Sequence, residues 1–174
     1  MRLIIHDLTS QDFRKAFPQL AESTKVISDD GTIHHCLGCF GCWVKTPAEC
    51  VIRDHYGDMG EHLSKCQEVL IISRCFYGGF SPFVKNVLDR SISYIHPYFK
   101  DRNGEMHHRR RYKNRIKLRV WFYGENITER EQNTAKKLVE ANCVNLDSNL
   151  EEVLFWHSVR EMGGSQYESS IDQW

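Results

Sequence analysis

The sequence has no excess of charge of either sign, because 23 Lys and Arg residues balance 23 Asp and Glu residues. A neutral chain creates no long-range field that would attract nucleic acid or an anionic membrane surface. No apolar run approaches the roughly 20 residues of a membrane-spanning helix. The first apolar run, at residues 3–5, is too short for a signal peptide. We therefore expect a cytoplasmic protein that binds neither nucleic acid nor membrane.

Internal repeats and low-complexity linkers are also missing, and the chain has only 4 prolines. Its 174 residues, 41% of them hydrophobic, suffice for one domain with a real core, so residues 1–174 are expected to form a single domain. One segment, at about residues 96–115, is basic and aromatic and is expected to be a surface excursion. The tail from Gly163 onward is polar and short, which predicts that a final helix is short or missing.

Cysteine, by contrast, is abundant. Four of the 7 cysteines follow a C-x2-C-x2-C-x7-C spacing, at Cys36, Cys39, Cys42 and Cys50. In a reducing compartment this favours metal binding, redox work or buried packing over disulfides. Three interpretations stay open: a [4Fe–4S] cluster on the four thiolates, a zinc site with unusually crowded ligands, or a tight glycine-containing loop of free thiols.

Apolar patterning predicts strands that alternate with helices. The expected strands are residues 3–5, 25–28, 69–73, 118–124 and 152–156. Helix starts are expected at Thr9, at Asp58 with Glu61, at Ser81 before Pro82, and at Thr128 with Glu131. This alternation predicts an α/β domain with a parallel sheet, in which ligands bind at the carboxyl ends of the strands.

Two motifs resemble the flavodoxin-like NADPH-dependent FMN reductases. The run from Ser73 to Arg90 resembles that family's third-strand loop and helix, and Cys36 to Asp54 resembles the cysteine segment of the same group, which includes iron–sulfur flavoproteins. Tyr123-Gly124 is similar to the start of the loop after the family's fourth strand. The resemblance implies a flavodoxin-like three-layer sandwich with a five-stranded parallel sheet, in the order 2-1-3-4-5.

The resemblance also implies an FMN-binding oxidoreductase. NADH or NADPH would give a hydride to the flavin, which would pass electrons to a small acceptor such as a quinone, and no side-chain acid or base would be required. Thr9 and Ser10 would meet the phosphate, and the cysteine stretch would form one wall of the site. The flavin ring would contact Ser73, Arg74, Cys75, Phe76, Tyr77, Gly78, Gly79, Tyr123 and Gly124. A homodimer or homotetramer is expected, with the 96–115 excursion as a candidate contact.

One departure from the family lies in the loop after the first strand. Hydroxyl groups remain there, but Asp7 and Asp12 place negative charge where a phosphate dianion would bind, which predicts a low affinity for FMN. Two alternatives follow. One is an iron–sulfur flavoprotein that carries electrons through a [4Fe–4S] cluster on the four cysteines. The other is a flavodoxin-like binding module without catalytic activity.

Overall fold

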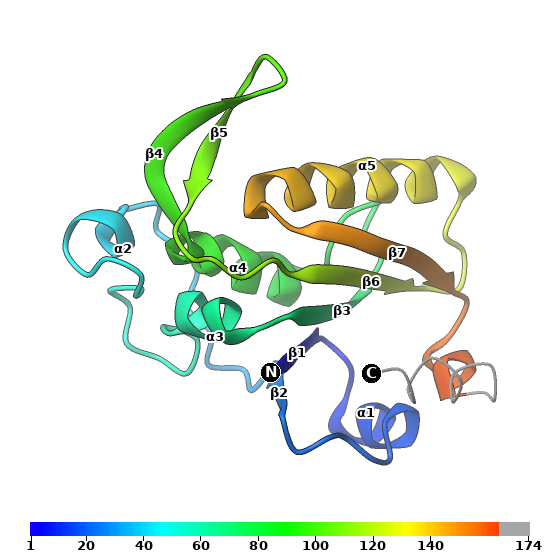
Figure 1. Cartoon of the computed structure of the whole chain (residues 1–174). Coiled ribbons are helices and arrows are strands. Elements are labelled where there is room, and N and C mark those ends of the chain that lie inside the picture. The colour runs from blue at the N-terminus through cyan, green and yellow to red at the C-terminus, as the bar shows by residue number, and fades with distance from the viewer. Residues whose placement is uncertain (164–174) are drawn as a thin grey trace.

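The computed structural model describes residues 1–163, and a five-stranded parallel sheet forms its centre (Figure 1). Its strands are β1 (Arg2–His6), β2 (Thr24–Ser28), β3 (Glu68–Arg74), β6 (Lys117–Tyr123) and β7 (Asn149–Trp156). They lie in the order β2-β1-β3-β6-β7, and every neighbouring pair is parallel. Counting only these five strands, the order is the expected 2-1-3-4-5. The flavodoxin-like α/β prediction is thereby confirmed.

The two faces of the sheet carry layers of unequal size. Alternate strand residues such as Leu3 and Ile71 pack beneath α3 (Met59–Lys65), α4 (Pro82–Arg90) and α5 (Glu129–Leu146). Their neighbours, such as Ile4 and Ile72, face α1 (Ser10–Ala16) and the 3-10 helix η2 (Val159–Gly163). Because both faces of β3 are covered, its apolar run is continuous, as in a central parallel strand. Short helices α2 (Gly41–Val44) and η1 (Ser91–Tyr94) complete the larger layer.

All four predicted helix starts are confirmed in position, and three of the four predicted caps make their hydrogen bond. Thr9, Ser81 and Thr128 each accept a hydrogen bond from a backbone N–H in the first turn, and Thr128 with Glu131 forms a capping box. The predicted cap at Asp58 is wrong, because its carboxylate makes no capping hydrogen bond. Its backbone (φ −102°, ψ 18°) lacks the extended conformation that directs a capping side chain back over the helix. The carboxylate instead pairs with His62 at 3.3 Å.

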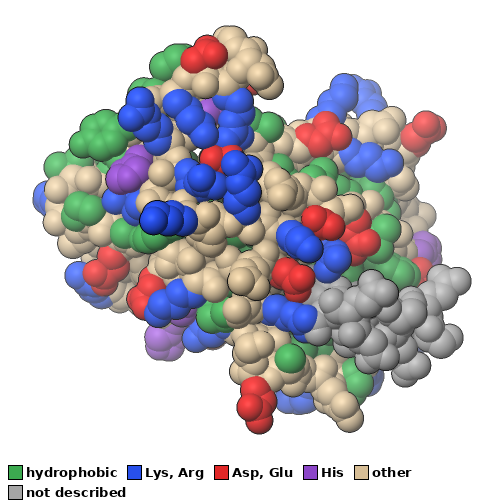
Figure 2. Space-filling model, viewed as in Figure 1, with side chains coloured by type: hydrophobic (Ala, Val, Ile, Leu, Met, Phe, Trp, Pro, Cys, Tyr) green, Lys and Arg blue, Asp and Glu red, His purple; other side chains and the backbone are tan. Residues whose placement is uncertain are grey.

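The basic segment contains a second, two-stranded antiparallel sheet that the sequence reasoning missed. Strands β4 (Ile95–Arg102) and β5 (Glu105–Arg110) form a hairpin that projects from the body (Figure 1). Its turn is Asn103-Gly104, and both residues have positive φ (56° and 84°), as a two-residue hairpin turn requires. Figure 2 shows Lys and Arg side chains gathered over this hairpin.

Asp147, at the end of α5, ties the hairpin to the body. Its buried carboxylate accepts hydrogen bonds from Lys100 (3.1 Å) and Arg102, both on β4. Burial opposes ionisation, but these cations still lower the pKa of Asp147 below its ordinary value. The hairpin is therefore held at its base by ion pairs with a buried anion.

Two further predictions concern membrane-spanning helices and the tail of the chain. Among residues 1–163, no helix is both long and apolar enough to cross a membrane. The polar tail from Gly163 onward lies, apart from its first residue, outside the described residues.

Candidate functional site

An open hollow of about 560 Å³ lies at the carboxyl ends of β3, β6 and β7. Four of the predicted ring contacts line it, namely Arg74, Cys75, Tyr123 and Gly124. The rest of the lining comes from residues 125–127 after β6, from Glu131 on α5, and from His157 and Ser158 after β7. The sequence reasoning missed this second group. The position of residues 125–127 and 157–158 directly after two parallel strands was the signal that could have identified them.

The loop after β3 folds into a tight turn of its own. Phe76 and Gly79 exchange backbone hydrogen bonds of 2.9 and 2.7 Å, which leaves Tyr77 and Gly78 as the two central residues. Both have positive φ (50° and 81°), and Tyr77 is 90% exposed. A Cβ atom on Gly78 would lie 2.7 Å from Cβ of Thr134, so only glycine lets this turn approach α5. The amides of Phe76 and Gly79, two of the predicted ring contacts, therefore hold the turn together.

Ser73 and Cys75 have structural partners within the same loop. The buried Ser73 hydroxyl accepts from the backbone N–H of Ser81 (2.8 Å) and donates to the carbonyl of Arg74 (3.0 Å), which fixes the start of α4. Burial raises the pKa of the Cys75 thiol, although the amide of Gly78 donates to its sulfur. A neutral thiol is a poor nucleophile and a poor metal ligand. Cys75 therefore lines the hollow as a neutral side chain.

Asp7 follows β1 and bridges three loops. Its carboxylate accepts the backbone N–H of Arg74 (2.9 Å) and the hydroxyl of Tyr123 (3.1 Å), and it interacts with the hydroxyl of Ser81. Burial raises the pKa of Asp7 against these hydrogen bonds. Burial and the nearby Asp7 also raise the pKa of Tyr123. In a sheet of this order the ligand crevice is expected between the loops after β1 and β3, and the Asp7 side chain spans that crevice.

The predicted phosphate contacts, Thr9 and Ser10, form the N-cap and first residue of α1 and lie outside the lining of the hollow. Thr9 accepts from the N–H of Asp12 (3.1 Å) and donates its proton to the Asp12 carboxylate (2.8 Å). The His6 ring stacks on Phe13 at 4.0 Å between ring centroids. Burial lowers the pKa of His6 to about 4, so the ring is neutral near pH 7. The loop therefore presents carboxylates to a ligand, and the buried His6 ring beside them carries no positive charge near pH 7.

The four clustered cysteines line a separate cavity of about 40 Å³. Cys36 and Cys39 are exposed, whereas Cys42 and Cys50 are buried. Burial and the neighbouring thiols raise the pKa of Cys42. Within residues 1–163, no group of three or more His, Cys, Asp or Glu side chains is placed to hold a metal ion. The cluster and the zinc interpretations therefore gain no support from the structure.

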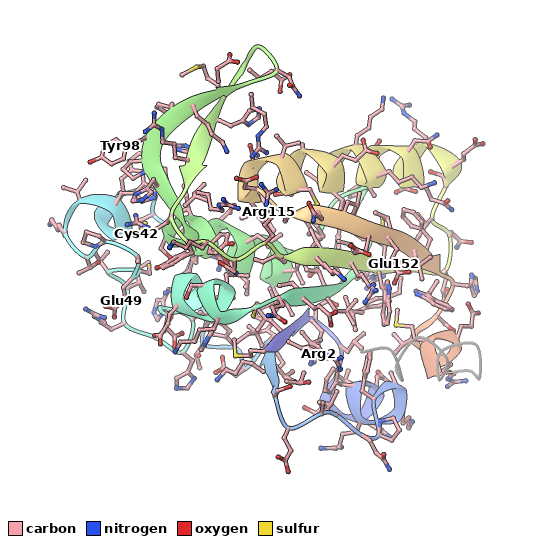
Figure 3. All side chains as sticks on the ribbon, viewed as in Figure 1. Arg2, Cys42, Glu49, Tyr98, Arg115 and Glu152 are labelled. Atoms are coloured by element: carbon pink, nitrogen blue, oxygen red, sulfur yellow. The ribbon has the colours of Figure 1, made fainter. Side chains whose placement is uncertain are left out.

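The cysteine cavity and the hollow share no lining residue in the described part of the chain. The backbone N–H of Cys36 donates to Asn86 in the second half of α4 (3.1 Å), and the indole of Trp43 donates to the carbonyls of Ile92 and Ile95. Figure 3 places Cys42 at α2, near the C-terminal end of α4. The loop with Ser73 caps the opposite end of that helix. The cysteine stretch therefore lies away from the hollow that it was expected to wall.

Comparisons with known proteins support the fold. No family model matches the chain, and no curated protein matches its sequence. General stress protein 14 of Treponema denticola, solved in complex with FMN, is 12% identical, with a TM-score of 0.57 over 99% of this chain and 98% of the other. This likeness decides the architecture. The chain has the flavodoxin-like fold.

Two further structures share the flavodoxin-like fold. The azoreductase AzrA is 10% identical, with a TM-score of 0.57 over 99% of this chain and 97% of that one. An FMN-dependent NADH-azoreductase from Bacillus anthracis, in complex with FMN, is 11% identical, with a TM-score of 0.55 over 99% and 97% of the two chains. At such identities the likeness concerns the arrangement of the chain in space.

Proposed function

We propose that this protein is a flavin-dependent oxidoreductase of the FMN-reductase type. NADH or NADPH would supply the hydride, and a small acceptor such as a quinone, another flavin or an electron carrier would take the electrons. The observation that carries the proposal is the hollow of about 560 Å³ at the carboxyl ends of β3, β6 and β7. It occurs in a fold shared with proteins solved in complex with FMN, at the sheet end where α/β domains bind ligands.

The ring end of a flavin fits this hollow. Its volume lies within the roughly 300–1,000 Å³ of typical ligand pockets. Tyr123 provides a half-buried aromatic surface, and Arg74 is held 5.5 Å above the ring centroid of Phe76 at the rim. Asn126 and Ser158 add hydrogen-bonding groups to the lining. When bound, the isoalloxazine ring would supply the redox chemistry, while these residues orient it and exclude water from one face.

The phosphate end of FMN does not fit. The loop after β1 offers the Asp7 and Asp12 carboxylates, and the Tyr123 and Thr9 hydroxyls already donate to them. A phosphate dianion would therefore meet like charge and engaged donors. We assign no role to the phosphate in the chemistry of this site.

The poor fit of the phosphate at the loop after β1 favours a second candidate, a flavodoxin-like binding module without catalytic activity. In that case the bridge that Asp7 forms to Arg74 and Tyr123 would replace the cofactor as the link between the loops. The iron–sulfur alternative lacks a comparable observation, because no metal-holding group occurs among residues 1–163.

We also propose a single domain over residues 1–174 and a cytoplasmic homo-oligomer that makes contact through the β4–β5 hairpin. Three large side chains on this hairpin support a contact there, since Tyr98, Phe99 and Met106 are 66%, 52% and 67% exposed. Figure 3 shows Tyr98 on the outer side of β4. Sedimentation of the wild type and of a Tyr98→Ser, Phe99→Ser double variant tests this, because a contact through the hairpin predicts dissociation of the variant.

Absorbance spectra test the proposed function. Protein purified with added flavin should retain bands near about 375 and 450 nm, which belong to the flavin ring. Adding NADH or NADPH without oxygen should bleach them. Protein that takes up neither FMN nor riboflavin would overturn the oxidoreductase and leave the binding module.

A further inference from the structure

The loop after β1 has an excess of hydrogen-bond acceptors, and the Asp7 carboxylate is the first of them. The backbone N–H of Arg74 and the hydroxyl of Tyr123 point at its two oxygens, at 2.9 and 3.1 Å. A phosphate placed between the loops after β1 and β3 would need these same donors. It would have to take them from a half-buried carboxylate, which would then lose its partners.

Asp12 is the second acceptor, and it lies in the first turn of α1. Its carboxylate accepts the proton of the Thr9 hydroxyl at 2.8 Å. It also compensates the positive end of the helix, as acidic residues in a first turn do. The seven residues of α1 give only a short helix. An approaching anion would thus meet a helix end whose partial positive charge is already compensated by the Asp12 carboxylate.

Neither His6 nor Arg74 offsets the charge of these two carboxylates at the loop itself. His6 accepts the N–H of Leu8 on its Nδ1 atom (3.2 Å) and is buried against Phe13. Arg74 lies at the rim with its guanidinium over the ring of Phe76. The exposed Arg74 guanidinium stands against two carboxylates, so this balance of charge is unfavourable for a dianion.

A ligand end that donates hydrogen bonds suits such a loop. A hydroxyl group can donate to a carboxylate oxygen, as ribose hydroxyls do to acidic residues in other nucleotide sites, whereas a phosphate dianion has no proton to give. We infer that the site selects a flavin whose side chain ends in a hydroxyl group, riboflavin, over FMN, and that Asp7 and Asp12 set this preference. The inference rests on the proposed function, because it names the flavin that the hollow takes.

Flavin fluorescence titrations of the purified full-length chain test the inference without measuring activity. Riboflavin and FMN have the same ring, so each reports binding through the same quenching signal. The wild type should bind riboflavin more tightly than FMN by about tenfold, the scale of one like-charge contact near a surface. Raising the salt concentration should strengthen FMN binding and leave riboflavin binding unchanged, since salt screens the repulsion.

Asp12→Asn is the main variant, because Asp12 is a half-buried first-turn residue whose asparagine replacement keeps an oxygen that can accept from Thr9, so the change is not expected to unfold the chain. The preference for riboflavin should fall about tenfold, mainly through tighter binding of FMN. Glu61→Gln is the matched control. Glu61 is likewise an acid in the first turn of a seven-residue helix, α3, far from the loop after β1 in sequence, and its variant should keep the wild-type ratio. Asp7→Asn should lower the ratio as well.

Each outcome decides a different point. If the wild type binds FMN more tightly than riboflavin, the inference is overturned and the proposed function stands. If riboflavin is preferred but neither aspartate variant changes the ratio, the assignment to Asp7 and Asp12 is overturned. If neither flavin binds, the proposed function fails and the inference fails with it.

Discussion

The two sides of β3 differ at its carboxyl end. On the side of β1, the Asp7 carboxylate bridges to Arg74 and Tyr123 and spans the crevice. On the side of β6 and β7, a hollow of about 560 Å³ is open. The chain shares its fold with a protein solved in complex with FMN, and in this chain the Asp7 side chain after β1 changes which part of the strand ends is available. The fold therefore fixes where a ligand can lie, and individual loop residues determine what it can be.

The largest expected effect concerns the wall of the open side. Gly78→Ala should lower the free energy of unfolding by about 3 kcal/mol, because its Cβ atom would overlap α5 in a backbone conformation that alanine resists. The Cβ atom would lie 2.7 Å from Cβ of Thr134 and 2.8 Å from the carbonyl oxygen of Glu131. Urea unfolding measures the loss.

Gly104→Ala is the matched control for Gly78→Ala. Gly104 has nearly the same φ (84°), but nothing lies within 4 Å of its added Cβ atom. Gly104→Ala should lower the free energy of unfolding by about 1 kcal/mol, which is the cost of placing alanine in this backbone conformation without any overlap. Equal losses in the two variants would show that the contact between this turn and α5 is loose.

On the closed side, Asp7→Ala should cost about 2 kcal/mol of unfolding free energy, because the donors on Arg74 and Tyr123 lose their acceptor. Asp7→Asn should cost less, since the amide oxygen still accepts one of them. Thermal and urea unfolding of both variants check the order. A variant Asp7→Ala as stable as the wild type would mean that water replaces the carboxylate without loss.

The carboxylates of the half-buried Asp7 and the buried Asp147 should respond to pH in opposite directions. Burial raises the pKa of Asp7, whereas Lys100 and Arg102 lower that of Asp147 against its burial. A raised pKa in the folded state means that the contribution of Asp7 is greatest in acid and is lost as the pH rises through that pKa. A lowered pKa means that the contribution of Asp147 is present above its unfolded pKa of about 3.9 and is lost as the pH falls through the folded value.

Unfolding free energies from pH 3 to 7 for the wild type, Asp7→Asn and Asp147→Asn measure these contributions. The unfolding free energy of the wild type should rise relative to that of Asp7→Asn as the pH falls towards about 4. The difference by which the wild type exceeds Asp147→Asn should shrink over the most acidic part of the range. Parallel curves for the two variants would contradict the different surroundings of the two carboxylates.

Much of the fold could be predicted from local sequence. The continuous apolar run of β3 and the caps at Thr9, Ser81 and Thr128 are signals carried by neighbouring residues. The β4–β5 hairpin was missed because its strands are basic and largely exposed, so only Asn103-Gly104 indicated it.

The candidate site was harder to predict because it depends on contacts between distant residues. The hydrogen bond from Tyr123 to Asp7 joins positions 116 residues apart. No spacing rule reveals that the acid after β1 takes the donors of two other loops. The cysteine segment was placed near the flavin by resemblance, whereas its contacts with Asn86, Ile92 and Ile95 bring it to the other end of α4.

Tyr123 lies at both the open and the closed side of the strand ends, because it lines the hollow and its hydroxyl donates to Asp7. Tyr123→Phe keeps the ring and removes the hydroxyl. Stability should fall by about 1 kcal/mol, the usual net value of one hydrogen bond. The pKa of Asp7 should rise further, because a donor that favours its charged form is lost. Riboflavin affinity should stay within about threefold of the wild type, since the aromatic surface remains. If flavin affinity collapses while stability is unchanged, the hydroxyl serves the ligand and Asp7 does not need it.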